Sequence, residues 1–243
     1  CNKVLTAAHC INKDPDPKKY FAFFQLLGFV KVKRIDWQPD AYKGIYADIA
    51  MLTLEKSVEG IAPIGINTSA TPINGAVATI VGFGRSGGNR FDYGIKREGS
   101  VKFSKCTGAY TDKRLLCWDF DADVKLKAGD YNTCNADSGG GIFMPDKVNN
   151  RIVQRVVGVV AGGRDENCVK NDHSYNTDVF AWREWLEKVG EGQLSDKVCG
   201  TSDSIDEPGN VKTAVVTLNS SKTEATEPPR DCRRLQLLRD WSH

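Results

Sequence analysis

Three residues of this sequence have the types and neighbours that nucleophilic catalysis requires. Ser138 follows an aspartate and precedes two glycines, whose missing Cβ atoms let the chain turn sharply and leave the hydroxyl accessible. His9 lies in the segment Thr-Ala-Ala-His-Cys, and Asp48 begins the apolar run Asp-Ile-Ala-Met-Leu. The order His, Asp, Ser along the chain is one of the known orders of a Ser-His-Asp triad.

Such a triad would perform acyl transfer. A serine hydroxyl is a weak nucleophile until a neighbouring base accepts its proton. The imidazole of His9 suits that role, because an unperturbed pKa of about 6.5 leaves it mostly neutral at neutral pH. Asp48 would accept a hydrogen bond from the other ring nitrogen, fix the tautomer and stabilise the imidazolium. We therefore predict that His9, Asp48 and Ser138 are catalytic.

The segments around these residues resemble the trypsin-like serine protease family, from residue 1 to about residue 190. The matching stretches are residues 4–10 (VLTAAHC), 48–52 (DIAML), 81–84 (VGFG), 134–140 (CNADSGG), 158–163 (GVVAGG) and 175–186. Residues 93–97 and 172–175 resemble the bacterial branch. The resemblance implies an all-β chymotrypsin-like double barrel with a C-terminal helix, and a serine endopeptidase that cleaves protein or peptide substrates through an acyl-enzyme.

The resemblance also assigns roles to the residues before the serine. It implies an oxyanion hole formed by the backbone N–H groups of Ala136 and Ser138. Alanine stands at 136 where the family has glycine, and a glycine-only backbone angle there would cost alanine about 1–2 kcal/mol. This departure supports an alternative, a weak or inactive pseudoprotease that acts as a protein-binding module. Asp137 would pair with the new N-terminal amine of a zymogen after an activating protease has cleaved it.

The family pattern places the substrate pocket around the residue six before the serine, which is Asn132. The other residues expected to line it are Thr133, Ala161, Gly162, Gly163 and His173. The two glycines leave the mouth open and offer backbone pairing to an extended peptide. Two hypotheses for specificity follow. Basic side chains would be favoured through Asp172, and acidic ones through Thr133 and His173.

Eight cysteines without a CxxC pair predict disulfides and an oxidising compartment, so we expect a secreted protein, extracellular or periplasmic. The resemblance implies two pairs, Cys106–Cys117 and Cys134–Cys168. The family partner of Cys10 would lie before residue 1, so the chain is interpreted as N-terminally truncated. The pairing of the remaining cysteines stays open: Cys1, Cys10, Cys199 and Cys232.

Composition narrows the class of protein further. The chain has 243 residues and a formal charge of +2, and its Lys and Arg residues are dispersed, which argues against a nucleic-acid partner. No stretch approaches the roughly 18 apolar residues of a membrane helix. His, Cys and acidic residues do not recur at metal-ligand spacing, and the glycines of residues 82–84 are too few for a dinucleotide fingerprint. We expect no metal and no cofactor.

Hydrophobic patterning predicts short strands followed by one helix. The apolar runs are residues 4–8, 21–29, 48–54, 76–81 and 151–160, and turn signals separate them, as in a β-sandwich or barrel. From Thr177 to Val189 the apolar spacing is helical, with Thr177 as N-cap and Gly190 as the stop. We predict a protease domain over residues 1–192. Residues 193–243 would be an extension, either disordered or part of a truncated module.

Overall fold

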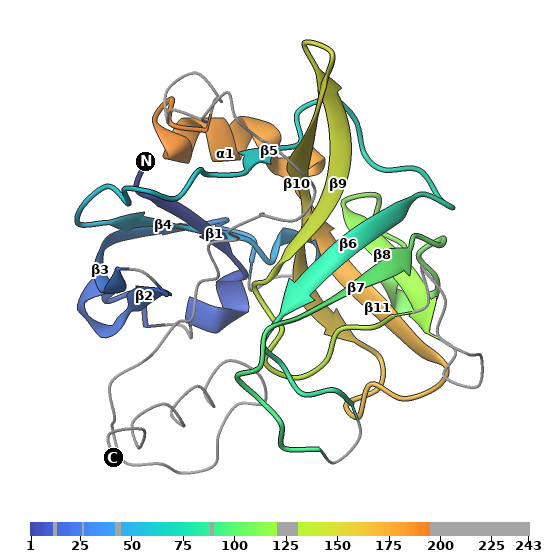
Figure 1. Cartoon of the computed structure of the whole chain (residues 1–243). Helices are drawn as coiled ribbons and strands as arrows, with labels where there is room; N and C mark the ends of the chain where they lie inside the picture. The colour runs from blue at the N-terminus through green and yellow to red at the C-terminus, as the bar shows by residue number, and fades with distance from the viewer. Residues whose placement is uncertain (12–13, 26, 42–44, 88–89, 121–130, 195–243) are drawn as a thin grey trace.

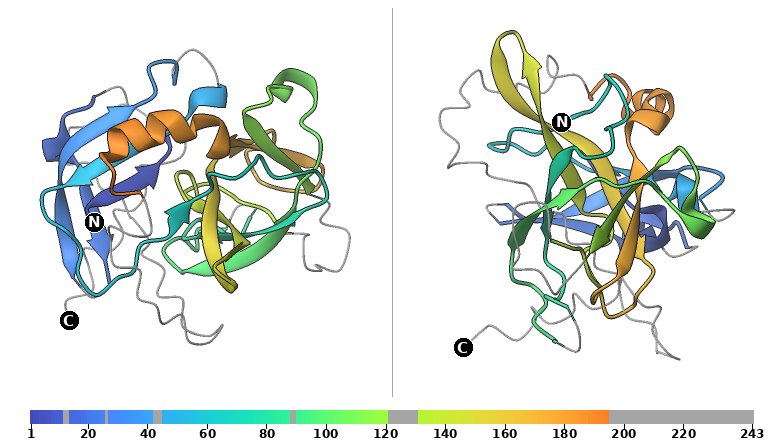
Figure 2. Two further views of the ribbon diagram at one scale, coloured as in Figure 1. Left: turned by 90° about the horizontal axis from the view of Figure 1, so that it is seen from above. Right: turned by 90° about the vertical axis from the view of Figure 1, so that its right-hand side faces the viewer.

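The computed structural model of the chain describes residues 1–11, 14–25, 27–41, 45–87, 90–120 and 131–194. In this part of the chain the strands form two curled antiparallel sheets, which lie side by side in Figures 1 and 2. The predicted double β-barrel is therefore confirmed. Most of the predicted extension, residues 195–243, lies outside the described residues.

The first sheet has the order β1-β4-β3-β2. Its strands are β1 (Lys3–Thr6), β2 (Phe21–Phe24), β3 (Gly28–Trp37) and β4 (Ala50–Leu54). The predicted run 21–29 is thus a hairpin, in which Gly28 has a φ of 70° that suits glycine. In β3, the step from Val32 to Ile35 breaks strict alternation. A register shift between Val32 and Arg34 accounts for it, because a bulge inserts one extra residue.

The second sheet has the order β7-β6-β9-β10-β11-β8, with β5 paired in parallel to β10. Its strands are β5 (Gly65–Ile66), β6 (Val77–Gly82), β7 (Arg97–Lys102), β8 (Leu115–Phe120), β9 (Gly141–Val148), β10 (Arg151–Gly163) and β11 (Asp172–Asp178). The β9–β10 hairpin extends beyond the rest of the sheet at the top of Figure 1. The remaining strands curl around a core of their own.

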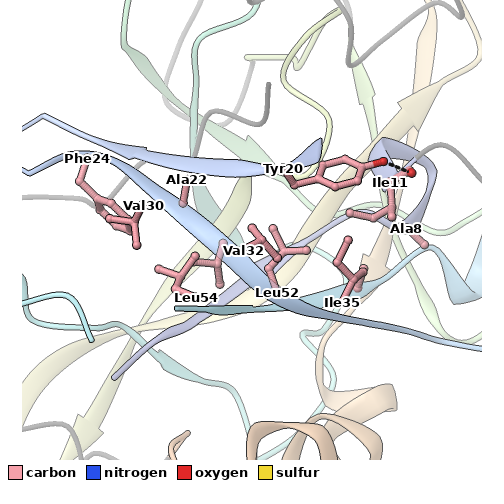
Figure 3. Close-up of a cluster of buried hydrophobic side chains, with 12 residues drawn as sticks. Ala8, Ile11, Tyr20, Ala22, Phe24, Val30, Val32, Ile35, Leu52 and Leu54 are labelled. Carbon is pink, nitrogen blue, oxygen red and sulfur yellow. Dashed lines mark hydrogen bonds between the residues drawn. The ribbon is translucent and has the colours of Figure 1, made fainter. Parts of the chain in front are cut away.

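The hydrophobic core consists of three apolar clusters, one inside each barrel and one between them. The first fills the first barrel, where side chains of β2, β3 and β4 converge and the Tyr20 hydroxyl donates to the carbonyl of Ile11 (Figure 3). The second fills the second barrel around Trp118 and Ile142. The third lies between the barrels and includes Ala7 and Leu186. This third cluster packs the segment before His9 against the helix that contains Leu186.

The C-terminal helix begins later than the sequence predicts. Helix α1 spans Arg183–Gly190, after a 3-10 helix over Phe180–Trp182. Thr177, the predicted N-cap, belongs to β11, where its backbone pairs with β8 and β10. Strand pairing on both sides outweighs the local helical pattern there, since it satisfies the backbone polar groups of a buried segment. The helix ends at Gly190, as predicted.

The end of the helix is tied to the first barrel by charge. Glu191 accepts from Lys3 at 2.8 Å and from Arg34 at 2.6 Å. These two hydrogen bonds lower the pKa of Glu191 to about 2.

Among the described residues, no helix has the length and apolar character that crossing a membrane requires.

Two isoleucines of the β9–β10 hairpin test this account of the second core. Ile142 is fully buried, whereas Ile152 is 63% exposed. We expect Ile142→Ala to lower the free energy of unfolding by about 2–5 kcal/mol, because it leaves a cavity. The matched change Ile152→Ala should alter it by less than about 1 kcal/mol. Denaturant unfolding of the two variants measures the difference, and equal losses would contradict the assignment of the core.

Candidate active site

The side chains of His9 and Asp48 form a closed pair. The carboxylate accepts from the His9 backbone N–H at 2.8 Å through Oδ1, and its Oδ2 lies 2.5 Å from Nδ1 of the ring. A carboxylate can only accept, so Nδ1 carries a proton, and in the neutral ring Nε2 is then the basic nitrogen. The His9 side chain is 32% exposed, whereas that of Asp48 is 12% exposed. The imidazole of His9 is therefore accessible to solvent, whereas the Asp48 carboxylate that orients it is largely buried.

Fully buried alanines and a bond from the second barrel hold this pair in place. Ala7 and Ala8 lead into the 3-10 helix that carries His9, and Ala47 precedes Asp48. The Thr177 hydroxyl of β11 donates to the backbone carbonyl of Asp48 at 3.0 Å. The small side chains permit close backbone approach, and the hydroxyl satisfies a buried acceptor. The site is thus built across the seam between the two barrels.

Ser138 lies in the loop that enters β9, and that loop packs against the segment leading to His9. A Cβ atom built on the next residue, Gly139, would stand 2.3 Å from the Thr6 hydroxyl and 3.2 Å from the Ala7 nitrogen. Gly139 has a φ of 81° and donates to the carbonyl of Val160 at 2.9 Å. No other residue could make so close an approach without displacing the neighbouring strand. The structure therefore places the serine beside the histidine segment.

The two predicted oxyanion donors have no hydrogen-bond acceptor among the described residues. Within the described residues, neither the N–H of Ala136 nor that of Ser138 donates a hydrogen bond to the chain. Ala136 has a φ of 74°, in the left-handed region that glycine adopts without strain. The backbone thus adopts the angle that the family's glycine would favour, and the alanine bears its cost.

The Asp137 carboxylate is enclosed behind this loop. It accepts from the N–H of Gly84 at 2.7 Å and from the N–H of Cys134 at 2.9 Å. Cβ atoms at Gly82 and Gly84 would overlap it, at 1.9 and 2.6 Å from its nearest atoms. Burial raises the pKa of Asp137, and the two N–H groups act in the opposite direction. The carboxylate holds the loop through backbone donors.

The expected pocket floor is a hydrogen-bonded cluster around Asn132. The side-chain oxygen Oδ1 of Asn132 accepts from the Trp118 indole at 2.9 Å and from the Ser174 hydroxyl at 2.8 Å. Its side-chain nitrogen Nδ2 donates to Asp172 at 2.9 Å. The other oxygen of Asp172 accepts from the N–H of Asp165 at 2.8 Å, and the residue is 1% exposed. No ion pair to Asp172 occurs among the described residues. A buried carboxylate therefore lies directly beside the Asn132 side chain.

Of the other expected pocket residues, two lie on the face of the sheet away from this cluster, Gly162 and His173. Thr133 and Ala161 are buried, and Gly163 lies so close to Asp172 that a Cβ atom would be 2.5 Å from its carboxylate. Gly162 similarly faces the ring of Tyr175. His173 points to the opposite side of β11, where its Nδ1 lies 2.7 Å from Asp119.

His173 therefore lies on the other face of β11 from the side chains that contact Asn132, and its contribution to a substrate pocket stays a prediction. Successive residues of a strand face opposite sides, so Asp172 and Ser174 share one face and His173 takes the other. Ser174 was missed by the sequence analysis. Strand alternation along residues 172–178 would have found it, had those residues not been predicted partly as helix.

Two disulfides secure the second barrel. Cys134–Cys168 joins the serine loop to the segment after β10, and Cys106–Cys117 joins β8 to the loop before it. Both are the pairs that the resemblance implies. Cys1 and Cys10 are disulfide-bonded as well. In the described part of the chain, no group of three or more His, Cys, Asp or Glu residues is arranged to hold a metal ion.

The double barrel and the residues at its seam place the protein in the chymotrypsin-like fold class. A model of the family described as Trypsin matches residues 1–186. A relative described as a Trypsin-like protease, from Streptomyces glaucescens, is 27% identical over 185 residues, covering 69% of this chain and 63% of the relative. The chain belongs to the trypsin family. It spans 63% of that relative's length.

The strain assigned to Ala136 is measurable. We expect Ala136→Gly to raise the free energy of unfolding by up to about 1 kcal/mol, because relief of the left-handed angle exceeds the greater entropy of the unfolded chain. Ala109 does not share the positive φ, so Ala109→Gly should lower it by about 0.5–1 kcal/mol. Thermal or denaturant unfolding of both variants provides the comparison. Destabilisation by Ala136→Gly would show that the alanine is not strained.

Proposed function

We propose that this protein is a secreted serine endopeptidase with His9, Asp48 and Ser138 as its triad. The observation that carries the proposal is the closed His9–Asp48 pair beside the Ser138 loop. The backbone N–H groups of Ala136 and Ser138 lie in that same loop, and neither has an acceptor within the part of the chain that the structure describes. General base, orienting carboxylate, nucleophile and oxyanion donors are the parts that acyl transfer needs.

The mechanism follows from these positions. The Ser138 hydroxyl attacks the scissile carbonyl carbon while Nε2 of His9 takes its proton, and Asp48 stabilises the imidazolium. The carbonyl oxygen becomes an oxyanion that the N–H groups of Ala136 and Ser138 would bind. The imidazolium protonates the amine leaving group, which yields the acyl-enzyme. Water, deprotonated by His9, then releases the acyl group and restores the serine.

Compartment and activation belong to the same proposal. The disulfides support an oxidising environment, in keeping with secretion. Asp137 would receive the N-terminal amine of a processed zymogen, because a buried carboxylate gains from an opposite charge. The rival function, a protein-binding pseudoprotease, is favoured by one observation: the non-glycine residue Ala136 at a φ of 74°. The intact triad favours the enzyme.

Covalent labelling separates the enzyme from its rival. We expect a fluorophosphonate probe to label the protein, expressed at its full natural length and matured, and to leave Ser138→Ala unlabelled. Asp48→Asn should label more slowly, by a factor of roughly 10⁴, because the wrong histidine tautomer is then favoured. Absence of label on folded, disulfide-bonded wild type would support the pseudoprotease, and restoration by Ala136→Gly would then identify the alanine as the cause.

We further propose that the enzyme cleaves after basic side chains. The buried Asp172 carboxylate accepts a hydrogen bond from Asn132, the expected floor residue. A cationic side chain that enters the pocket would therefore be attracted to this carboxylate, which lies directly beyond the floor. Cleavage after acidic residues would place like charges together. The residue expected to favour acidic side chains, His173, faces Asp119.

Peptide substrates that differ only in the residue before the scissile bond test this preference. We expect kcat/KM to be highest for Lys or Arg. Asp172→Asn should reduce that preference over Leu by about 10- to 100-fold, since a hydrogen bond to a charged group contributes about 1.5–3 kcal/mol. Asp146→Asn removes a carboxylate from the β9–β10 hairpin and should leave the preference unchanged. Wild-type cleavage mainly after Leu or Phe would overturn the assignment.

A further inference from the structure

A network of loop residues before β7 is tied to the peptide that carries the first oxyanion donor. The N–H of Arg85 donates to the carbonyl of Asn135 at 3.1 Å. That carbonyl and the N–H of Ala136 belong to one planar peptide unit and point in opposite directions. Holding the carbonyl on one side therefore directs the N–H of Ala136 to the other side. The preceding residue, Gly84, holds Asp137 in the same way.

Arg97, the first residue of β7, holds the backbone that carries the N–H groups of Gly84 and Arg85. It pairs with Gly82 across the sheet, and its guanidinium donates to the Gly84 carbonyl at 3.0 Å and to the Asp92 carbonyl at 3.1 Å. The guanidinium also forms an ion pair with the Asp92 side chain at 2.9 Å. One side chain thus joins the strand, the loop and the residue that contacts Asp137.

Asp92 closes the network onto the start of the loop. Its carboxylate accepts from the Ser86 N–H at 2.9 Å and from the Ser86 hydroxyl at 2.7 Å. These two bonds hold the pKa of Asp92 below its ordinary value, with a smaller contribution from Arg97. Ser86 is the residue after Arg85, so the carboxylate anchors the chain one residue from the N–H that binds Asn135.

We propose that Arg97, with Asp92 and Ser86, is a positioning clamp for the oxyanion hole. This inference rests on the proposed endopeptidase function. The clamp sets the backbone of Gly84 and Arg85, and these residues orient the Asp137 carboxylate and the Ala136 N–H. A non-glycine residue at a φ of 74° has a reason to leave that angle, so an external hold has a clear use. The three residues act through the backbone of the segment 84–86 and are therefore positioning residues.

Kinetics of clamp variants test the proposal. We expect Arg97→Gln and Asp92→Asn each to lower kcat by about 10- to 100-fold, somewhat less than the loss of an oxyanion donor, with KM within about twofold. Affinity for a peptide aldehyde, which forms an oxyanion on Ser138, should fall by the same factor. The double variant should be no worse than the worse single one, because both changes open one network. Arg97→Lys should retain part of the activity.

A matched control is Arg34→Gln, which breaks an arginine ion-pair cluster of the first barrel. It should leave kcat, KM and aldehyde affinity unchanged. A change confined to KM in the clamp variants, a kcat within twofold of wild type, or additive losses would overturn the proposal. If Arg97→Gln does not fold, Asp92→Asn and Ser86→Ala carry the same test.

Amide hydrogen exchange tests the clamp independently of turnover. In Arg97→Gln, exchange of the Gly84 and Arg85 N–H groups should rise at least about tenfold, while that of amides in β4 stays unchanged. Wild type without turnover, combined with faster exchange in the variant, would refute the endopeptidase and keep the clamp. Unchanged exchange in the variant would refute the clamp, whether or not the wild type is active.

Discussion

The arrangement of the candidate site depends on one enclosed carboxylate, that of Asp137. A carboxylate removed from water needs hydrogen-bond donors, and here backbone N–H groups of Gly84 and Cys134 supply them. The Asp137 side chain leaves no space for a Cβ atom at residues 82 and 84, and both are glycines. Satisfying this one group draws the loop before β9 and the turn after β6 together. Ala136 lies between Cys134 and Asp137 along the chain, and Ser138 directly follows Asp137.

The seam between the barrels supplies the second half of the site. Neither barrel holds all three residues of the proposed triad, because His9 and Asp48 come from the first and Ser138 from the loop that enters β9 of the second. The close approach of Gly139 to Thr6 and the bond from Thr177 to Asp48 cross that seam. Ala7 and Leu186 belong to the apolar cluster packed there. Burial of that cluster therefore stabilises the relative placement of nucleophile and base.

Charge is distributed unevenly around the seam. Asp48 is paired with His9, whereas the buried carboxylates of Asp137 and Asp172 are satisfied by neutral N–H groups. Such carboxylates keep a negative potential that a cation can still relieve. The two therefore differ from Glu191 and Asp92, whose carboxylates are each paired with a cationic side chain. A third buried carboxylate, that of Asp178, likewise accepts from neutral donors, the Thr71 hydroxyl and the Phe180 N–H.

The sequence by itself determined the fold class and the identity of the candidate triad. A motif such as Ser138 between an aspartate and two glycines consists of neighbouring residues, so it can be recognised from the sequence without knowledge of the fold. The start of α1 was predicted too early, because pairing of Thr177 with two neighbouring strands is a long-range effect. Only the tertiary structure decided that Asp172 and Ser174, rather than His173, face Asn132. The same holds for the contact of Arg85 with Asn135 and for that of Arg97 with Gly84. Which face of a strand is buried, and which loop lies beneath another, depends on packing between residues far apart in the chain.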